Sequence, residues 1–266
     1  MVAGVAAVAG APTAALVLAA ASMTFLQFAI GAVNDVVDAP RDAGRKPHKP
    51  IPSGGVTASW AVVVGIGAAT LGLGMALAVG VVLAAMAVVV LGIGLVYDLR
   101  LKGTPWSWLP FAVGIPILPV YGWLGARGTV PDLTPVILGV AFLEGAALAL
   151  ANGLVDIERD RDAGTESAVT RLGAARAAAL GIAIQVTVAL AAGGAGWGIG
   201  IGVPAAWVAG TASVLMISGS LVSRSGVAVS TTPGIERREL GWRIQALGAA
   251  VLALGWIGGA AQAGRL

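Results

Sequence analysis

The 266-residue chain contains no cysteine and only one histidine, His48. The lack of cysteine excludes disulfide bonds and thiol catalysis, and it leaves the redox compartment undecided. A Ser-His-Asp triad would have His48 as its single possible base, and no nucleophile motif lies beside it. We therefore interpret His48 as a loop residue. The glycine runs complete neither a GxGxxG motif nor a P-loop.

Charged residues are also scarce, since they make up 11% of the chain whereas 58% is hydrophobic. Soluble domains carry roughly 25% charge, so this composition is typical of a protein that crosses a membrane. A span needs about 20 apolar residues, and turn or charge signals divide the chain into segments of that length. The predicted spans are 12–34, 57–78, 80–97, 107–124, 133–155, 174–197, 201–222 and 241–260.

The predicted fold is therefore an all-α, polytopic membrane helix bundle that forms one domain, residues 1–266. Residues 1–10 are apolar but too few to cross a bilayer. We expect them to be the last part of a further, ninth span that begins upstream of the recorded start. A cleaved signal peptide is disfavoured, because no basic region precedes the apolar stretch.

Basic residues are confined to particular loops. All but two of the 16 lysines and arginines lie in or beside residues 35–56, 98–106, 156–176 and 223–243. Counting the spans alternately places these four loops on one side of the membrane. The positive-inside rule predicts that this side is the cytoplasm, and we expect the membrane to be the cell membrane. The same distribution accounts for the net charge of +3 without a nucleic-acid partner.

Two short polar stretches of the same pattern end two of the predicted spans. The two triplets, 118 positions apart, are Asn34, Asp38, Asp42 and Asn152, Asp156, Asp160. Both end a span that runs toward the basic loops, so they would meet water at the same surface. The correspondence suggests two related halves, about 1–125 and 126–266, as in other membrane proteins built from repeats.

The spacing within each triplet places its members on one helix face. Four residues make about 400° of helical turn. Pro40 is expected to end the first helix, because proline lacks a backbone donor and disfavours helix just before it. Asp42 would then lie in the following loop. The second triplet has no such break and is expected to continue as helix through Asp160.

Clustered carboxylates repel one another unless a cation neutralises them, and hard oxygen ligands suit Mg²⁺. This ion is usually held by one or two carboxylates together with substrate phosphates. Two such clusters facing one another would form a metal-bridged diphosphate site. The basic residues placed to bind diphosphate oxygens are Lys46, Lys49, Arg100 and Lys102. The alternatives are a solvated helix end for each acidic cluster and an ordinary loop charge for each basic residue.

Five segments then suggest a family: "NDVVDAPRD", "KPIPSG", "YDLRLKG", "DIERDRDAG" and "TRLG", in that order. Together they resemble the UbiA superfamily of intramembrane prenyltransferases, whose pattern is NDxxDxxxD in the first half and DxxxDxxxD in the second. The first motif is complete in this chain. The second has Asn152 in place of its first aspartate, which keeps a carbonyl ligand but removes one negative charge.

The resemblance implies nine helices around a cavity that opens to lipid, with two Mg²⁺ bridging an isoprenyl diphosphate. The implied activity moves the isoprenyl group to a lipophilic acceptor. The expected metal ligands are Asn34, Asp35, Asp38, Asp42, Asn152, Asp156 and Asp160. The expected substrate-binding residues are Asn34, Gln27, Lys46, Lys49, Arg100, Asn152 and Tyr97, and the expected catalytic residues are Asp38, Asp156 and Lys102.

Aromatic residues gather around the fourth predicted span; they are Tyr97, Trp106, Trp108, Phe111, Tyr121 and Trp123. Their faces can stabilise the cation-like allylic fragment that forms when diphosphate leaves. The alternative is an aromatic belt at the membrane interface. That alternative accounts well for the three tryptophans.

Two polar residues lie deeper in the predicted spans. Gln27 precedes Asn34 by seven residues and lies within about 20° of the same helix face, so we expect it to reach the cavity. Glu144 is the only acid well inside a span. Intramembrane acids are costly and often functional, so Glu144 either flanks the cavity or hydrogen-bonds between helices.

Other functions share parts of this pattern. A terpene cyclase of the same superfamily would ionise the same diphosphate without an acceptor. A transporter or channel would carry its acids near mid-membrane among broken helices, whereas these acids lie at span ends. A non-catalytic relative that binds prenyl diphosphate is compatible with Asn152.

Overall fold

The computed structural model describes residues 1–43, 49–229 and 231–266. In this part of the chain all regular structure is helical, so the predicted all-α fold is confirmed. The elements are α1 (Val2–Val8), α2 (Thr13–Asp42), α3 (Ala58–Val79), α4 (Val81–Val96), η1 (Tyr97–Leu101), α5 (Leu109–Arg127), α6 (Thr134–Val155), α7 (Ile157–Asp162), α8 (Ala168–Leu172), α9 (Ala174–Ile199), α10 (Val203–Ser225) and α11 (Thr232–Gln262).

Eight of the described helical segments are long and apolar enough to cross a membrane, and they coincide with the eight predicted spans. Their outward faces carry large apolar side chains. Leu190 is 72% exposed and Trp197 is 90% exposed, which suits contact with lipid. Helix α11 begins at Thr232, earlier than the predicted start at 241, because hydropathy marks only the apolar part of a helix that continues through an arginine-rich turn.

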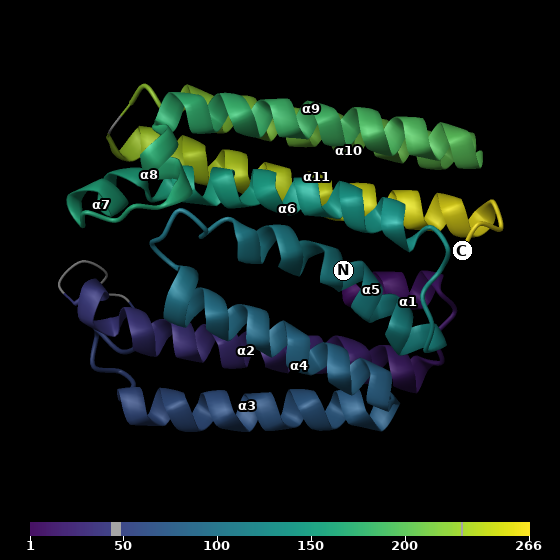
Figure 1. The fold of residues 1–266 in the computed structure, drawn as a ribbon, viewed down its shortest axis with the longest axis horizontal. Helices are drawn as coiled ribbons and strands as arrows, with labels where there is room; N and C mark the ends of the chain where they lie inside the picture. The colour runs from purple at the N-terminus through teal and green to yellow at the C-terminus, as the bar shows by residue number, and fades with distance from the viewer. Residues whose placement is uncertain (44–48, 230) are drawn as a thin grey trace.

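The long helices lie roughly along one common axis (Figure 1). Helices α2, α3 and α4 form one side of the molecule, α9, α10 and α11 form the other, and α5 and α6 lie between them. Each side has its own apolar core, with Leu26 and Leu83 in the first and Met216 and Leu252 in the second.

One end of the bundle collects the loops that the sequence predicted to share a side. Helices α2, α4, α6 and α10 run toward this end, and α3, α5, α9 and α11 start from it (Figure 1). We call it the motif end. Because all four basic loops meet there, the alternating topology is consistent with the fold.

Glycines allow helix backbones to touch at two interfaces. A Cβ atom on Gly219 of α10 would lie 2.7 Å from the carbonyl oxygen of Gly241, and one on Gly241 of α11 would lie 2.5 Å from that of Gly219. A Cβ atom on Gly145 of α6 would lie 2.8 Å from Cα of Ala112. This close approach holds α5 against α6 and places the backbone of Phe111 beside the middle of α6.

The prediction that Pro40 ends the first helix was wrong. Helix α2 continues to Asp42, and the amide of Ala43 still donates to the carbonyl oxygen of Ala39 at 3.1 Å. A proline removes only its own backbone donor, so the following amides complete one more turn. Asp42 therefore stays on the helix rather than in a loop.

The expectation of a continuous second helix was also wrong. Helix α6 ends at Val155, and Asp156 has φ −101° and ψ 5° before α7 begins at Ile157. The Asp156 carboxylate pairs with Arg159 in the next turn. After this break the chain continues as the short separate helix α7 at the motif end (Figure 1).

Candidate active site

Three carboxylates of α2 converge on one lysine that follows the first motif. The Nζ atom of Lys49 lies 3.0 Å from an oxygen of Asp35, 3.7 Å from one of Asp38 and 2.7 Å from one of Asp42. Asp38 and Asp42 are buried, with exposed fractions of 8% and 6%. Continuation of α2 through Pro40 is what brings Asp42 onto this face.

Lys49 is held in its charged form by these acids. Burial by itself lowers the pKa of Lys49, but hydrogen bonds and charge attraction from Asp42 and Asp35 outweigh burial, so the pKa is raised above its ordinary value. The ammonium group is thus a cation placed where three carboxylates meet. It neutralises a cluster that would otherwise repel itself.

The turn after α4 supplies a second cation. Lys102 follows the single π-helical turn η1, and its Nζ atom lies 2.5 Å from Oδ2 of Asp38 and 5.9 Å from the centre of the Tyr97 ring. Turns of this kind occur frequently at functional sites. The structure therefore brings Asp38, Lys102 and Tyr97 together.

Asp98 belongs to this group and was missed by the sequence analysis. It is 4% exposed, and its Oδ1 atom accepts a hydrogen bond from Nδ2 of Asn34 at 2.7 Å. This bond links η1 to the first residue of the first triplet. The available signal was an acid inside "YDLRLKG", a segment from which only Tyr97, Arg100 and Lys102 were selected.

The second triplet lines one pocket together with the two aspartates of the first triplet. A cavity of about 200 Å³ is lined by Asn152, Asp156 and Asp160 together with Asp38 and Asp42. It lies between α2 and η1 on one side and α5 to α8 on the other. The pocket thus joins residues 118 positions apart in the sequence.

The donor set fits a divalent cation that is shared with a phosphate ligand. Among the described residues, no three acidic or histidine side chains lie close enough together to hold a metal ion by themselves. However, oxygens of Asp35, Asp38 and Asp42 already surround the ammonium group of Lys49, which stands in for a metal ion. Mg²⁺ needs only one or two carboxylates when phosphate oxygens complete its shell.

Aromatic side chains form part of the pocket wall. Tyr97, Trp108 and Phe111 line it, and the rings of Tyr97 and Phe111 meet edge to face at 6.3 Å. The alternative, an aromatic belt at the membrane interface, agrees with Trp106, which is 60% exposed. It does not agree with Trp123, which is buried in the core.

The remaining predicted residues lie elsewhere. Gln27 is exposed on α2, where its Nε2 atom contacts Sδ of Met23 at 3.6 Å, and Arg100 is also exposed. Neither lines the pocket, and the same holds for Asn34, Asp35 and Lys49. Lys46 and His48 fall outside the described residues.

Long apolar helices with a polar pocket at one end define an integral, multi-pass membrane protein with a site for a charged group. The model of the UbiA prenyltransferase family matches residues 1–230, and the chain belongs to this family. No curated protein sequence matches the chain.

Solved structures are similar over nearly the whole chain. A UbiA homologue from Aeropyrum pernix K1 has 17% identity and a TM-score of 0.74 over 96% of this chain and 93% of its own. The Archaeoglobus fulgidus homologue bound to GPP and Mg²⁺ has 18% identity and a TM-score of 0.64 over 94% of both chains. Digeranylgeranylglyceryl phosphate synthase has 15% identity and a TM-score of 0.72 over 98% of this chain and 91% of its own. At these identities the likeness shows the fold.

Proposed function

We propose that the chain transfers an isoprenyl group from an isoprenyl diphosphate to a lipophilic acceptor. The observation that carries this proposal is the pocket that joins Asp38 and Asp42 of the first triplet with the whole second triplet and Lys102, in a chain of the UbiA family. The Archaeoglobus fulgidus homologue bound to GPP and Mg²⁺ supports the donor class. The expected two related halves stay a prediction.

In the proposed reaction the bond between the allylic carbon and the diphosphate oxygen breaks, and both electrons leave with the oxygen. The acceptor's nucleophilic carbon or hydroxyl then bonds to the allylic cation and loses a proton to water. Mg²⁺, held by Asp38 and Asp42 from α2 and by Asp156 and Asp160 around α7, would stabilise negative charge on the leaving diphosphate.

This chain's own residues supply three further contributions. Lys49 and Lys102 place positive charge beside the carboxylates, where diphosphate oxygens would develop negative charge. Asn34 and Asn152 supply neutral oxygen or nitrogen partners beside the carboxylates. The ring of Tyr97, together with Phe111, lines the pocket and offers π-faces to an allylic cation.

The test is diphosphate release by the purified protein in lipid. Geranyl, farnesyl and geranylgeranyl diphosphates are each supplied with and without Mg²⁺, alone and with an acceptor panel. We expect magnesium-dependent release and an acceptor-linked product. Asp38→Ala and Asp156→Ala should each abolish release, whereas Asp132→Ala, in the exposed loop at the opposite end, should not.

Each outcome separates the proposal from its rivals. A cyclised product formed from a diphosphate alone would identify a cyclase. Magnesium-dependent donor binding without release would identify a non-catalytic relative. Full activity in either aspartate variant would exclude the metal-bridged site.

We also propose that the motif end faces the cytoplasm and that the membrane is the cell membrane. The concentration of lysine and arginine in the loops at this end supports the orientation.

A further inference from the structure

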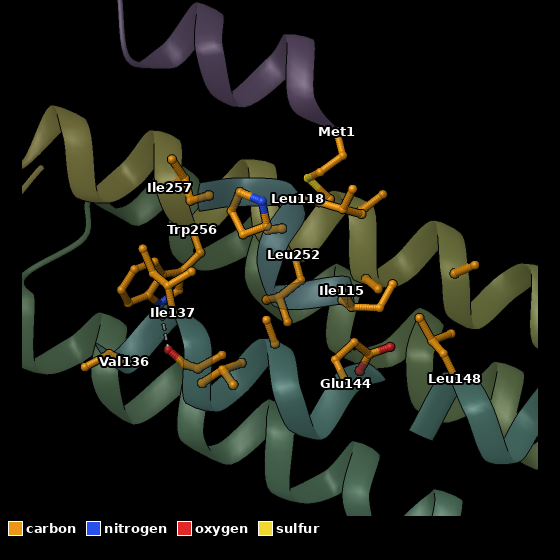
Figure 2. A pocket seen from close by; sticks show the side chains of 18 residues that line it. Met1, Ile115, Leu118, Val136, Ile137, Glu144, Leu148, Leu252, Trp256 and Ile257 are labelled. Carbon is orange, nitrogen blue, oxygen red and sulfur yellow. Dashed lines mark hydrogen bonds between the residues drawn. The ribbon is translucent and has the colours of Figure 1, made fainter. Parts of the chain in front are cut away.

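A second cavity, of about 240 Å³, lies among α5, α6 and α11. Its walls are almost entirely apolar, as Figure 2 shows for Ile115, Leu118 and Leu252. Trp256 also lines it, but its indole N–H donates to the carbonyl oxygen of Ala192 at 3.0 Å. Glu144 has the one charged side chain in the wall, and we call this space the Glu144 cavity.

The carboxyl group of Glu144 is only half satisfied. The residue is 4% exposed, and its Oε1 atom accepts a hydrogen bond from Nε2 of Gln185 at 3.1 Å. Its Oε2 atom is buried and has no hydrogen-bond partner among the described residues. Figure 2 shows the carboxyl group among the apolar side chains of the cavity wall.

Hydrogen bonding between helices accounts for only one of the two carboxyl oxygens. Behind Glu144, Gln185 of α9 also donates to Oε1 of Gln245 of α11 at 3.4 Å, and Ser220 of α10 donates to the same oxygen at 3.0 Å. This network fixes the orientation of the carboxyl group from one side. It does not reach Oε2, which is left for an occupant of the cavity.

A hydrocarbon occupant would leave Oε2 buried without a partner, which is unfavourable. A hydroxyl group matches this oxygen in either state of Glu144, because it can donate to a carboxylate or accept from a carboxylic acid. We propose that the Glu144 cavity binds a lipid-soluble alcohol or phenol. We assign this molecule as the prenyl acceptor, and this assignment rests on the proposed function.

The place of the cavity defines what the hydroxyl does. Phe111 and Asn152 line the active-site pocket, and Ile115 and Leu148, one turn deeper on the same helices, line the Glu144 cavity. Glu144 precedes Asn152 by eight residues, or about 12 Å along α6. The hydroxyl bound to Glu144 therefore anchors the acceptor, and a different atom of the acceptor is the nucleophile.

The first test compares 2-naphthol with 2-methylnaphthalene, which share a ring system and differ in a hydroxyl or a methyl group. Binding to the purified protein in detergent is measured by equilibrium dialysis and corrected with protein-free micelles. We expect 2-naphthol to bind about three- to ten-fold more tightly, the range for one net hydrogen bond. Glu144→Met should bind both probes equally, and Glu144→Gln should keep the preference.

Equal binding of the two probes to the unmodified protein would overturn the hydroxyl inference, even if the variants fail to fold. Binding of neither probe would overturn the cavity as a ligand site. A preference that survives in Glu144→Met would exclude Glu144 as the partner.

Competition with geranyl diphosphate and Mg²⁺ tests the acceptor assignment. Simultaneous binding of diphosphate and 2-naphthol supports it. Displacement of 2-naphthol would assign the cavity to the donor's hydrocarbon chain. Failure of the diphosphate to bind at all would overturn the proposed function and the acceptor role, whereas the hydroxyl preference would stand.

Discussion

Replacing Glu158 by glutamine should destabilise the protein by removing the partner of a buried arginine. Arg238 of α11 is fully buried, and its guanidinium donates to Oε2 of Glu158 at 2.6 Å and to the carbonyl oxygen of Gly226 at 3.1 Å. Breaking a buried ion pair from one side costs about 3–5 kcal/mol. Glu158 is 29% exposed, so water offsets part of this loss and we expect about 2 kcal/mol. In a chain of this size that lowers Tm by roughly 4–8 °C.

The measurement is thermal unfolding of the purified protein in detergent. Glu239→Gln is the matched control, because Glu239 pairs with Arg243 at 2.5 Å on the same helix while both side chains are exposed. Exposed pairs one turn apart contribute only about 0.3–0.5 kcal/mol. Equal shifts in Tm for Glu158→Gln and Glu239→Gln would refute the claim that Glu158→Gln leaves Arg238 as a buried charge without its partner.

The same pair should matter for the site, because it ties α7 to α11. Asp156 and Asp160 lie at the start of α7 and within it. If the proposed function holds, Glu158→Gln should raise the Mg²⁺ concentration needed for half-maximal diphosphate release more than it lowers the maximal rate. An unchanged Mg²⁺ requirement would show that the Glu158–Arg238 pair contributes to stability alone.

Three further predictions concern packing, topology and metal binding. Gly241→Ala should destabilise the α10–α11 contact by about 1–3 kcal/mol in thermal unfolding, whereas Gly210→Ala, with open space around its Cβ position, should not; equal effects would contradict close packing. Since the chain has no cysteine, a membrane-impermeant maleimide should label Thr129→Cys but not Ser53→Cys in intact cells, and the reverse would invert the topology. Asn152→Asp should strengthen or leave unchanged the Mg²⁺ dependence of diphosphate release, and a marked loss would give the asparagine a role of its own.

Hydropathy and charge predicted the helices well, because each span must be apolar along its whole length whatever it packs against. The spacing of the acids also predicted that Asp38 and Asp156 would line one pocket. Where a helix is interrupted was not predictable from hydropathy, charge or spacing. Whether Pro40 ends a helix depends on where the next amides find acceptors, and the break at Asp156 accompanies its contact with Arg159.

Contacts between distant helices left no periodic signal in the sequence. Arg238 appeared to be one more charge in a basic loop region, yet it is fully buried against Glu158, 80 positions away. Asp98 was hidden within a basic segment, and its role became visible only through the bond from Asn34. In each case the partner is fixed by tertiary packing.

The charge pattern of the motif end therefore serves two purposes that a sequence alone cannot separate. Basic residues near the span ends orient a membrane protein, and two of them, Lys49 and Lys102, also neutralise the buried carboxylates of α2. Buried acids of like charge are unfavourable unless paired, so these lysines hold the cluster together. If the proposed function holds, Asp38 and Asp42 would hold Mg²⁺ while Lys49, which contacts the same two carboxylates, would keep positive charge beside the diphosphate.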